Sequence, residues 1–242
     1  MPAIKLEDLT WIEAEAALTA DCIVVIPLGA ALKEHGPHLK LNNDYRIAGY
    51  LAEQVLQQAT SDHNIVVLPT VNYCFYPAFV EYPGSVSLSQ DTARDTIVQI
   101  CESISNFGPK RFYCINTGIS TLRALEPAAK HLADSGITLH YTNLETIVAA
   151  TVREVSEQEG GSHADEIETS MMLVIAPQTV DMSKAVKDFD KTGRGRLSRQ
   201  QAPGKTYSPT GIWGDASLAT VEKGQAVVKS LVSGILEEIS RL

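Results

Sequence analysis

Short apolar runs alternate along the chain with longer segments in which apolar residues recur at helical spacing. The runs are Cys22–Leu28, Ile65–Val71, Arg111–Ile115 and, with a weaker pattern, Ile137–Tyr141. Runs this short, rich in β-branched and aromatic residues and bounded by turn residues, predict strands. Because the first three lack a regular polar alternation, we expect these strands to be buried on both faces.

The segments between the runs have the period of amphipathic helices. In one of them Ile97, Ile100 and Ile104 share a face, and Ser89 is the expected N-cap. The predicted helices are Tyr45–Gln58, Gln90–Phe107, Leu122–Ser135 and Ala219–Arg241. Strands that alternate with such helices predict an α/β fold with a mostly parallel sheet covered on both sides. A chain of 242 residues is expected to form one domain over residues 1–242.

Ligands of parallel sheets bind at the carboxyl ends of the strands. The loops that follow residues 28, 71, 115 and 142 are therefore the places to look for chemistry. One polar stretch, Asp188–Thr210, is rich in Gly and Pro and interrupts the alternation. We expect it to be a long surface loop that covers a site or contacts another subunit.

The charge and the cysteines exclude several classes of protein. There are 29 acidic and 20 basic residues, which give a net charge of −9, and no run of Lys or Arg forms a basic patch. Nucleic acid and anionic membranes are therefore not expected partners. The first ten residues lack the apolar segment of a signal peptide, and the four cysteines form no C-x-x-C pair. We therefore expect a cytoplasmic protein with reduced thiols.

The loop after the first predicted strand concentrates metal-binding residue types. Glu34, His35, His38 and Asp44 lie within eleven residues, and Gly36 allows the backbone to turn between the two histidines. Carboxylate and imidazole together suit Zn, Mn or Fe better than Ca or Mg. The alternative is that Glu34 and His35 are solvated loop residues and that Asp44 caps the following helix.

A second acidic segment begins at His163. Asp165 and Glu166 suit the first turn of a helix and are expected to face solvent. Glu168 instead shares a face with apolar residues such as Met171. A carboxylate on such a face must be paired, protonated or bound to a metal ion. The alternative to a metal ligand is a salt bridge or a contact between the helix and a loop.

Other segments carry weaker signals. The turn at 116–121 follows a strand, so Asn116 and nearby backbone amides are candidates to stabilise an oxyanion, or are simply helix caps. Ser85 follows a Pro-Gly turn but lies in no G-x-S-x-G elbow. Trp213 lies between glycines and either lines a pocket or packs under a loop. No role is assigned to His63, His131 and His140.

Taken in order along the chain, these segments resemble the creatinine amidohydrolase (creatininase) family. The segments that carry the likeness are Leu9–Glu13, Pro27–Gly29, Glu34–Leu39 with Asp44, Pro83–Leu88, His163 with Glu168–Leu173, and Gly214–Asp215 with Ala219–Gly224. The resemblance implies a three-layer α/β/α fold, a homo-oligomer that is a hexamer in the better-known members, and a two-metal site of Zn or Mn. It also implies hydrolysis of C–N bonds in cyclic or linear amides.

The resemblance assigns roles to individual residues. It makes Glu34, His35 and Asp44 metal ligands, with Asp44 placed to bridge two ions. His163 matches a histidine that contacts substrate. Glu168 matches the Glu of an E-T-S segment, which is a metal ligand or an acid/base group.

Two departures from the family pattern change these expectations. The family motif reads E-Q-H-G, whereas here Glu34 directly precedes His35 in a loop one residue longer, and Lys33 stands where the family Glu would fall. The next metal loop of the family reads N-G-H, whereas residues 116–121 contain neither His nor an acid. We therefore expect one well-held ion, Zn or Mn with Fe as a third choice, and a second site that is weak or empty.

The first hypothesis is a metal-dependent amidohydrolase that cleaves a C–N bond other than a peptide bond with a metal-activated water. Its substrate is a small amide other than creatinine. Glu168 or His163 would move the proton to the leaving nitrogen, Asn116 would steady the oxyanion, and Ser85 and Trp213 would contact the substrate. The second hypothesis is a non-catalytic member that binds a ligand or serves assembly.

Overall fold

The computed structural model describes residues 3–59, 64–193 and 195–242. The strands are β1 (Ile4–Lys5), β2 (Cys22–Leu28), β3 (Asn64–Val67), β4 (Arg111–Asn116), β5 (Thr138–Tyr141), β6 (Lys187–Asp188), β7 (Leu197–Ser198), β8 (Thr206–Tyr207) and β9 (Gly214–Asp215). The helices are α1 (Trp11–Ala17), α2 (Asn43–Gln58), α3 (Gln90–Ser105), α4 (Leu122–Ala133), α5 (Leu144–Ile147), α6 (Ala149–Val155), α7 (Glu166–Ile175) and α8 (Val221–Ser240).

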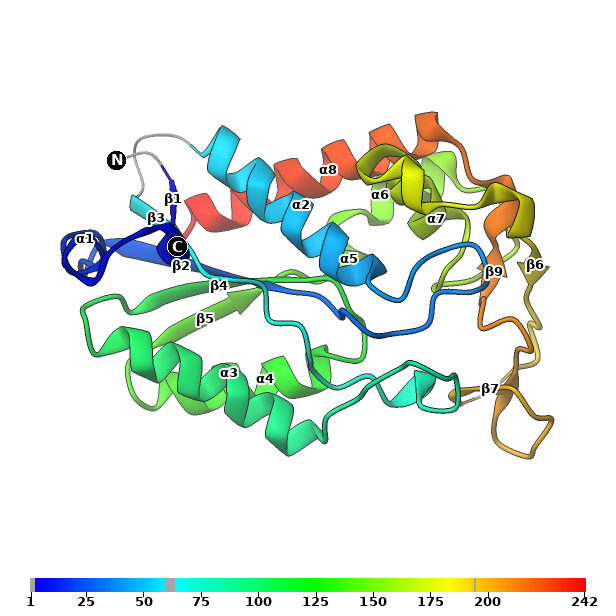
Figure 1. Cartoon of the computed structure of the whole chain (residues 1–242), viewed down its shortest axis with the longest axis horizontal. Coiled ribbons are helices and arrows are strands. Elements are labelled where there is room, and N and C mark those ends of the chain that lie inside the picture. The colour runs from blue at the N-terminus through cyan, green and yellow to red at the C-terminus, as the bar shows by residue number, and fades with distance from the viewer. Residues whose placement is uncertain (1–2, 60–63, 194) are drawn as a thin grey trace.

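A parallel sheet with the strand order β1-β3-β2-β4-β5 forms the centre of the described residues. Strand β2 pairs with β3 on one side and with β4 on the other (Figure 1). The chain passes from β2 through α2 to β3, then crosses back through α3 to β4. This order confirms the predicted parallel α/β architecture.

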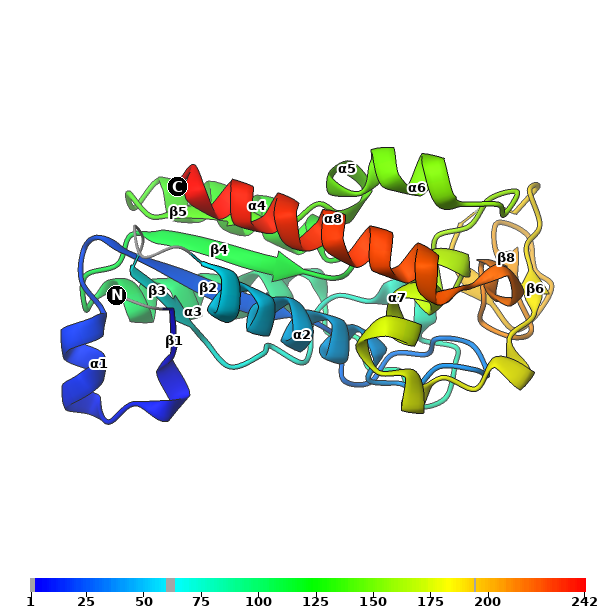
Figure 2. The same cartoon turned by 90° about the horizontal axis from the view of Figure 1, so that it is seen from above.

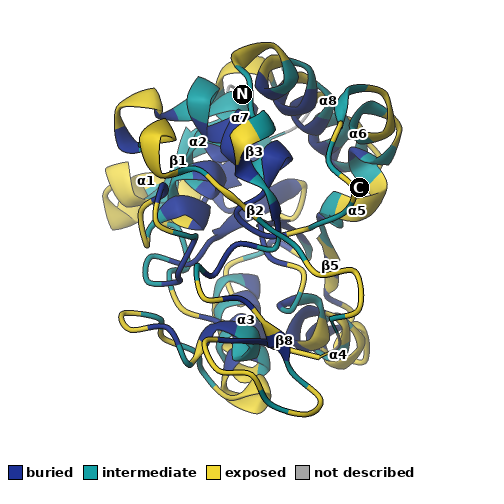
Figure 3. Cartoon of the chain, turned by 90° about the vertical axis from the view of Figure 1, so that its right-hand side faces the viewer, coloured by how far each residue is buried: buried dark blue, intermediate teal, exposed yellow. Residues whose placement is uncertain are grey.

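The two faces of the sheet are covered by different helices (Figures 1 and 2). Ile23 and Val25 pack in one apolar cluster with α2, α7 and α8. Val24 and Ile26 pack in a second cluster with α3 and α4. Because successive side chains of a strand point to opposite faces, a continuous apolar run such as β2 supplies both cores. The three-layer arrangement is confirmed, and Figure 3 shows the buried strands between the two layers of helices.

Element boundaries differ from the predictions where proline or short helices intervene. Strand β3 ends at Val67 rather than Val71, because Pro69 has no N–H to donate to a ladder. Val71 then returns to form an isolated bridge with Leu28. The short helices α5 and α6 carry no clear sequence signal and were not predicted. His63 lies outside the described residues.

The expectation that Asp165 and Glu166 face solvent is wrong. Glu166 is 0% exposed, and Asp165 is also buried. The Glu166 carboxylate accepts hydrogen bonds from the backbone of Glu157 and Gln158, and it forms an ion pair with Lys223 of α8. Burial alone would raise the pKa of Glu166, but these partners hold that pKa below its usual value. Glu166 therefore fastens α7 to α8 and to the turn before it.

The described part of the chain contains no helix that is long and apolar enough to cross a membrane.

Gly29 permits the close approach of α2 to the end of β2. A Cβ atom at this position would lie 2.3 Å from the backbone oxygen of Asp44. We expect Gly29→Ala to lower the free energy of unfolding by about 1–3 kcal/mol, because the helix must shift. The matched control is Gly49→Ala in α2, where an added Cβ has no atom within 4 Å and should stabilise by about 0.5–1 kcal/mol. Denaturant unfolding distinguishes the two, and equal effects would contradict the packing argument.

The anchoring role of Glu166 predicts a large loss of stability in Glu166→Gln. This variant keeps the shape of the side chain but removes the buried charge that pairs with Lys223, which then retains the exposed Glu157 carboxylate. We expect a loss of about 2 kcal/mol in the free energy of unfolding. Glu154→Gln on α6, where the side chain is exposed, is the control and should change stability by less than about 0.5 kcal/mol. A Glu166→Gln variant as stable as this control would refute the anchoring role.

Candidate functional site

Polar side chains converge where β2 and β4 end. The loop at 29–42 leaves β2 toward α2, and the turn at 117–121 leaves β4 toward α4. Helices α2 and α4 pack on opposite faces of the sheet, so the two loops diverge at this edge. Parallel sheets place their ligand sites at such a point. The start of α7 completes the site from a distant part of the chain.

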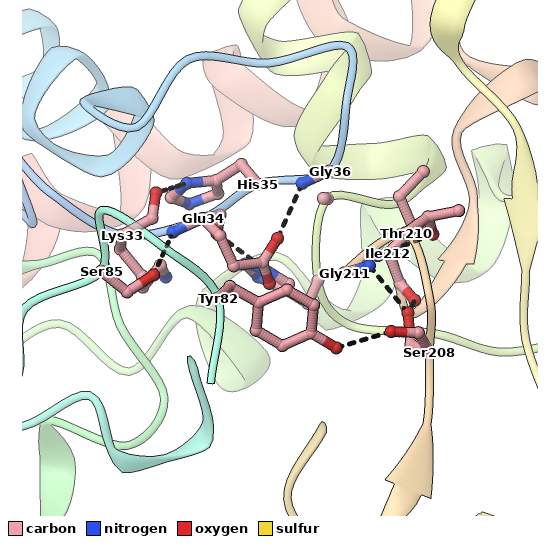
Figure 4. A network of polar contacts seen from close by, with 12 residues as sticks. Lys33, Glu34, His35, Gly36, Tyr82, Ser85, Ser208, Thr210, Gly211 and Ile212 are labelled. Atoms are coloured by element: carbon pink, nitrogen blue, oxygen red, sulfur yellow. Dashed lines mark hydrogen bonds and ion pairs between the residues drawn. The ribbon is translucent and has the colours of Figure 1, made fainter. Parts of the chain in front are cut away.

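Specific hydrogen bonds fix the conformation of the loop after β2 (Figure 4). Ser85 Oγ accepts a hydrogen bond from the backbone N–H of Glu34 at 3.0 Å. The Glu34 carboxylate accepts one from Gly36 N at 2.9 Å. Gly211 gives this carboxylate room, because a Cβ atom at Gly211 would lie 2.1 Å from Glu34 Oε2. The loop therefore presents residues 33–35 in a fixed conformation.

His35 is buried, and its two ring nitrogens have different neighbours. Nδ1 donates a hydrogen bond to the backbone oxygen of Lys33 at 2.8 Å. Nε2 lies 2.8 Å from Asp44 Oδ1 and 3.3 Å from Glu168 Oε1. A carbonyl oxygen can only accept, so Nδ1 carries a proton and Nε2 is the nitrogen that faces the carboxylates.

His163 has the same arrangement with the ring nitrogens exchanged. Nε2 donates to the Glu34 backbone oxygen at 3.0 Å and lies 2.9 Å from Glu34 Oε1. Nδ1 lies 3.7 Å from Glu168 Oε2. The ring of Phe79 packs against His163 with a centroid distance of 4.3 Å. The inward nitrogen of His163 therefore faces the same carboxylate as that of His35.

Glu168 reaches the two histidines from the first turn of α7. Asp165 caps this helix by accepting hydrogen bonds from the backbone N–H groups of Ile167 and Glu168. Ala164 has a positive φ of 48°, which is uncommon for a residue with a side chain. This turn lets Ala164 N donate to Glu168 Oε2 at 2.7 Å. Backbone strain next to a polar cluster is typical of functional sites.

Three of these side chains form a candidate metal centre. The ligand atoms offered by His35, His163 and Glu168 all lie within 4.8 Å of one another. Two imidazoles and a carboxylate are a donor set that Zn, Mn and Fe accept. The outer N–H of each histidine donates to a backbone carbonyl, of Lys33 and of Glu34 respectively, which is how metal-binding histidines are usually oriented. The residues therefore fit a single divalent ion.

An ion pair adjoins this centre. Lys33 Nζ lies 2.7 Å from Asp44 Oδ2, and both side chains are buried. Burial alone would raise the pKa of Asp44 and lower that of Lys33. The attraction between the two charges, with His35 adding to it for Asp44, outweighs burial and shifts both pKa values the other way.

The pKa values of the buried imidazoles of His35 and His38 are shifted in opposite directions. Burial would lower the pKa of His35, but the Asp44 and Glu168 carboxylates raise it to about 9. Burial lowers the pKa of His38 to about 4, and His38 Nε2 lies 2.8 Å from Thr169 Oγ1. The pKa of Glu168 is held well below its usual range, because the charge of His35 outweighs its burial. In the absence of a metal ion, the charges of His35 and Lys33 together therefore balance those of the Asp44 and Glu168 carboxylates.

The structure brings some of the residues predicted from the sequence together and places others farther away. His35, His163 and Glu168 form the cluster. Glu34 and Asp44 lie directly beside it, against His163 and His35 respectively. Lys33 and Phe79 belong to the same region but were not assigned a role. The departure from E-Q-H-G was a signal for Lys33, whereas nothing in the sequence pointed to Phe79.

The remaining candidates lie farther out. The Asn116 amide donates to the backbone oxygens of Gly118 and Thr142 and accepts from Thr121, so it joins its own loop to the end of β5. Ser85 supports the backbone of Glu34. Trp213 contacts the ring of Phe189 and lines the cavity described next.

A cavity of about 680 Å³ opens beside the cluster. Lys33, His163 and Glu168 contribute polar atoms to its wall. Its apolar wall includes Phe79, Ile119, Leu144, Met171 and Trp213. Residues 193 and 195–197 also line it, so the segment at 188–210 forms one side of the site. The volume suits a small organic molecule.

Comparison with known proteins places this arrangement in a family. A sequence model of the creatinine amidohydrolase family matches residues 7–239. The mycofactocin precursor peptide peptidase of Mycolicibacterium smegmatis is 28% identical over 222 residues, which cover 90% of this chain and 85% of that protein. The creatinine amidohydrolase of Pseudomonas putida is 26% identical over 256 residues, which cover 98% of this chain and 96% of that protein.

Solved structures agree with the sequence match. A crystal structure of creatinine amidohydrolase superposes with a TM-score of 0.81 at 25% identity, over 98% of this chain and 96% of that one. A manganese form and a zinc–zinc form of creatininase, each 24% identical, have the same fold with TM-scores of 0.81. They cover 99% and 98% of this chain, and 98% and 97% of their own lengths. Because sequence and fold match over nearly the whole chain, the protein belongs to the creatinine amidohydrolase (creatininase) family, a family of hydrolases.

Proposed function

We propose that this protein is a metal-dependent amidohydrolase that cleaves a C–N bond of a small cyclic or linear amide other than creatinine. The observation that supports it is the convergence of His35, His163 and Glu168, with ligand atoms within 4.8 Å of one another, at the wall of a cavity. Residues 1–242 act as one domain in this proposal, because the loop after β2 and the start of α7 both contribute ligands.

The proposed ligands are His35 Nε2, His163 Nδ1 and a Glu168 oxygen, with Zn or Mn as the ion and Fe as a third choice. Such an ion supplies Lewis acidity and lowers the pKa of a coordinated water. Glu34 and Asp44, which the sequence suggested as ligands, take supporting roles. Glu34 orients His163, and Asp44 faces His35 from the side of Lys33.

The chain's own residues supply the remaining chemistry. Glu168 and His163 are the members of the cluster that line the cavity. Both ring nitrogens of His163 are used, one by the ion and one by Glu34, so we assign proton transfer to the leaving nitrogen to the Glu168 oxygen that does not hold the ion. Phe79 and Trp213 provide apolar walls that exclude water and hold the substrate. We assign stabilisation of the oxyanion to hydrogen-bond donors on the cavity wall instead of Asn116, because the Asn116 amide is already bonded to the backbone of Gly118 and Thr142.

Location and assembly are also part of the proposal. The four cysteines are all free and buried, which fits a reducing compartment such as the cytoplasm. A homo-oligomer, a hexamer by the family resemblance, is expected, and light scattering after size exclusion would measure its mass. The partner at the site is a small molecule, with neither nucleic acid nor membrane involved.

Metal binding tests the proposal directly. Zn²⁺ or Mn²⁺ at 100 times Kd should stabilise the folded chain by about 2.7 kcal/mol, which raises Tm by roughly 5–10 °C for a domain of this size. His35→Ala and Glu168→Gln should lose this shift, because each removes a ligand. His131→Ala, whose side chain is exposed, is the control and should retain it. An unchanged Tm of the native protein with both metals would favour a non-catalytic family member.

Hydrolysis provides the second test. A panel should contain cyclic amides, linear N-acyl amides and short peptides, since the relatives include a peptidase and an amidohydrolase. We expect turnover of a small amide that is lost on chelation, and a fall in kcat/KM of more than about 100-fold in His35→Ala. Cleavage of peptides alone would overturn the choice of bond. Turnover that survives both chelation and His35→Ala would overturn the metal dependence.

A further inference from the structure

We propose that the Lys33 ammonium is a built-in cation that takes the place of a second metal ion, so that the centre binds one divalent ion per chain. This inference rests on the proposed function, since it presupposes an ion at His35, His163 and Glu168. Lys33 is 5% exposed, although lysine is rarely buried to this degree without a paired charge. Its position is therefore a feature that requires an explanation.

The Asp44 carboxylate is the first line of support. Its Oδ1 lies 2.8 Å from His35 Nε2, on the side of the proposed ion. Its Oδ2 lies 2.7 Å from Lys33 Nζ and has no other hydrogen-bond partner within the described part of the chain. A carboxylate that bridges two cations offers one oxygen to each. At Asp44 the second oxygen already faces the ammonium, which leaves a single side for a metal ion.

The balance of charge is the second line of support. Glu34, Asp44 and Glu168 bring three negative charges to the cluster. One divalent ion together with Lys33 balances these charges while both imidazoles stay neutral, as ligation requires. Two divalent ions beside Lys33 would leave a buried excess of positive charge, which low-dielectric surroundings strongly disfavour. Asp165 does not alter this balance, because it accepts hydrogen bonds from the amides that begin α7.

The surroundings of Nζ are the third line of support. Nζ lies 4.8 Å from the ring centroid of Phe79 and 5.6 Å from that of Tyr76. Aromatic faces attract a cation without offering it a ligand atom that a metal ion would use. Asp44 is therefore the residue that holds the Lys33 ammonium in position.

The sequence around the site agrees with this assignment. Residues 116–121 contain neither a histidine nor an acidic residue, so the turn after β4 offers no such ligand to a second ion. Lys33 also lines the cavity, so N–H groups of the ammonium that are not directed at Asp44 can donate to a substrate carbonyl oxygen.

Metal counting tests the proposal. The metal-free protein is titrated with Mn²⁺, and the ions bound per chain are measured by native mass spectrometry and calorimetry. We expect one ion in the native protein and in Lys33→Arg, which keeps the charge. Lys33→Glu adds a fourth carboxylate and should bind two. Lys33→Gln removes the charge with little change of volume and should bind the single ion at least about tenfold more tightly, because the nearby repulsion is gone.

Each outcome has a distinct meaning. Two ions in the native protein overturn the role of Lys33 but not the proposed function. Equal Kd values for Lys33→Gln and Lys33→Arg overturn that role as well, and this comparison decides the matter where Lys33→Glu does not fold. If neither the native protein nor any of these variants binds an ion, the proposed function itself is overturned.

Discussion

The centre depends on the neutralisation of three carboxylates that the fold withdraws from water. Glu34, Asp44 and Glu168 lie within reach of two imidazoles and one ammonium. A buried charge without a partner destabilises a protein by several kcal/mol, so none of these groups can be understood alone. The raised pKa of His35 and the lowered pKa of Glu168 are two consequences of this one constraint.

The parallel sheet makes this concentration of charge possible. Strand β2 is buried on both faces, so its end is fixed by two apolar clusters at once. Glu166 joins α7 to α8 by an ion pair. Glu34 and His163, which are 129 residues apart, therefore meet at hydrogen-bond distance. Side chains presented by rigid elements keep the geometry that a metal ion requires.

Family membership and substrate choice depend on different parts of the molecule. The sheet and the helices match creatininase structures over almost the whole chain. The named relatives nevertheless include a peptidase and a creatinine amidohydrolase, so the shared fold does not define the substrate. The cavity wall is formed in part by loops, which include residues 117–120, Gly193 and Trp213, and loops on a rigid scaffold commonly determine what a site binds.

The sequence by itself determined the parallel α/β fold, the order of its main helices and the two acidic segments that supply the site. Apolar periodicity and turn residues act over a few positions, so they can be read without knowledge of the fold. Burial of Glu166, the inward use of Asn116 and the pairing of Lys33 with Asp44 were decided only by the tertiary structure. Each depends on which distant element packs against the residue, because a charged or amide side chain takes its role from the partner it meets there.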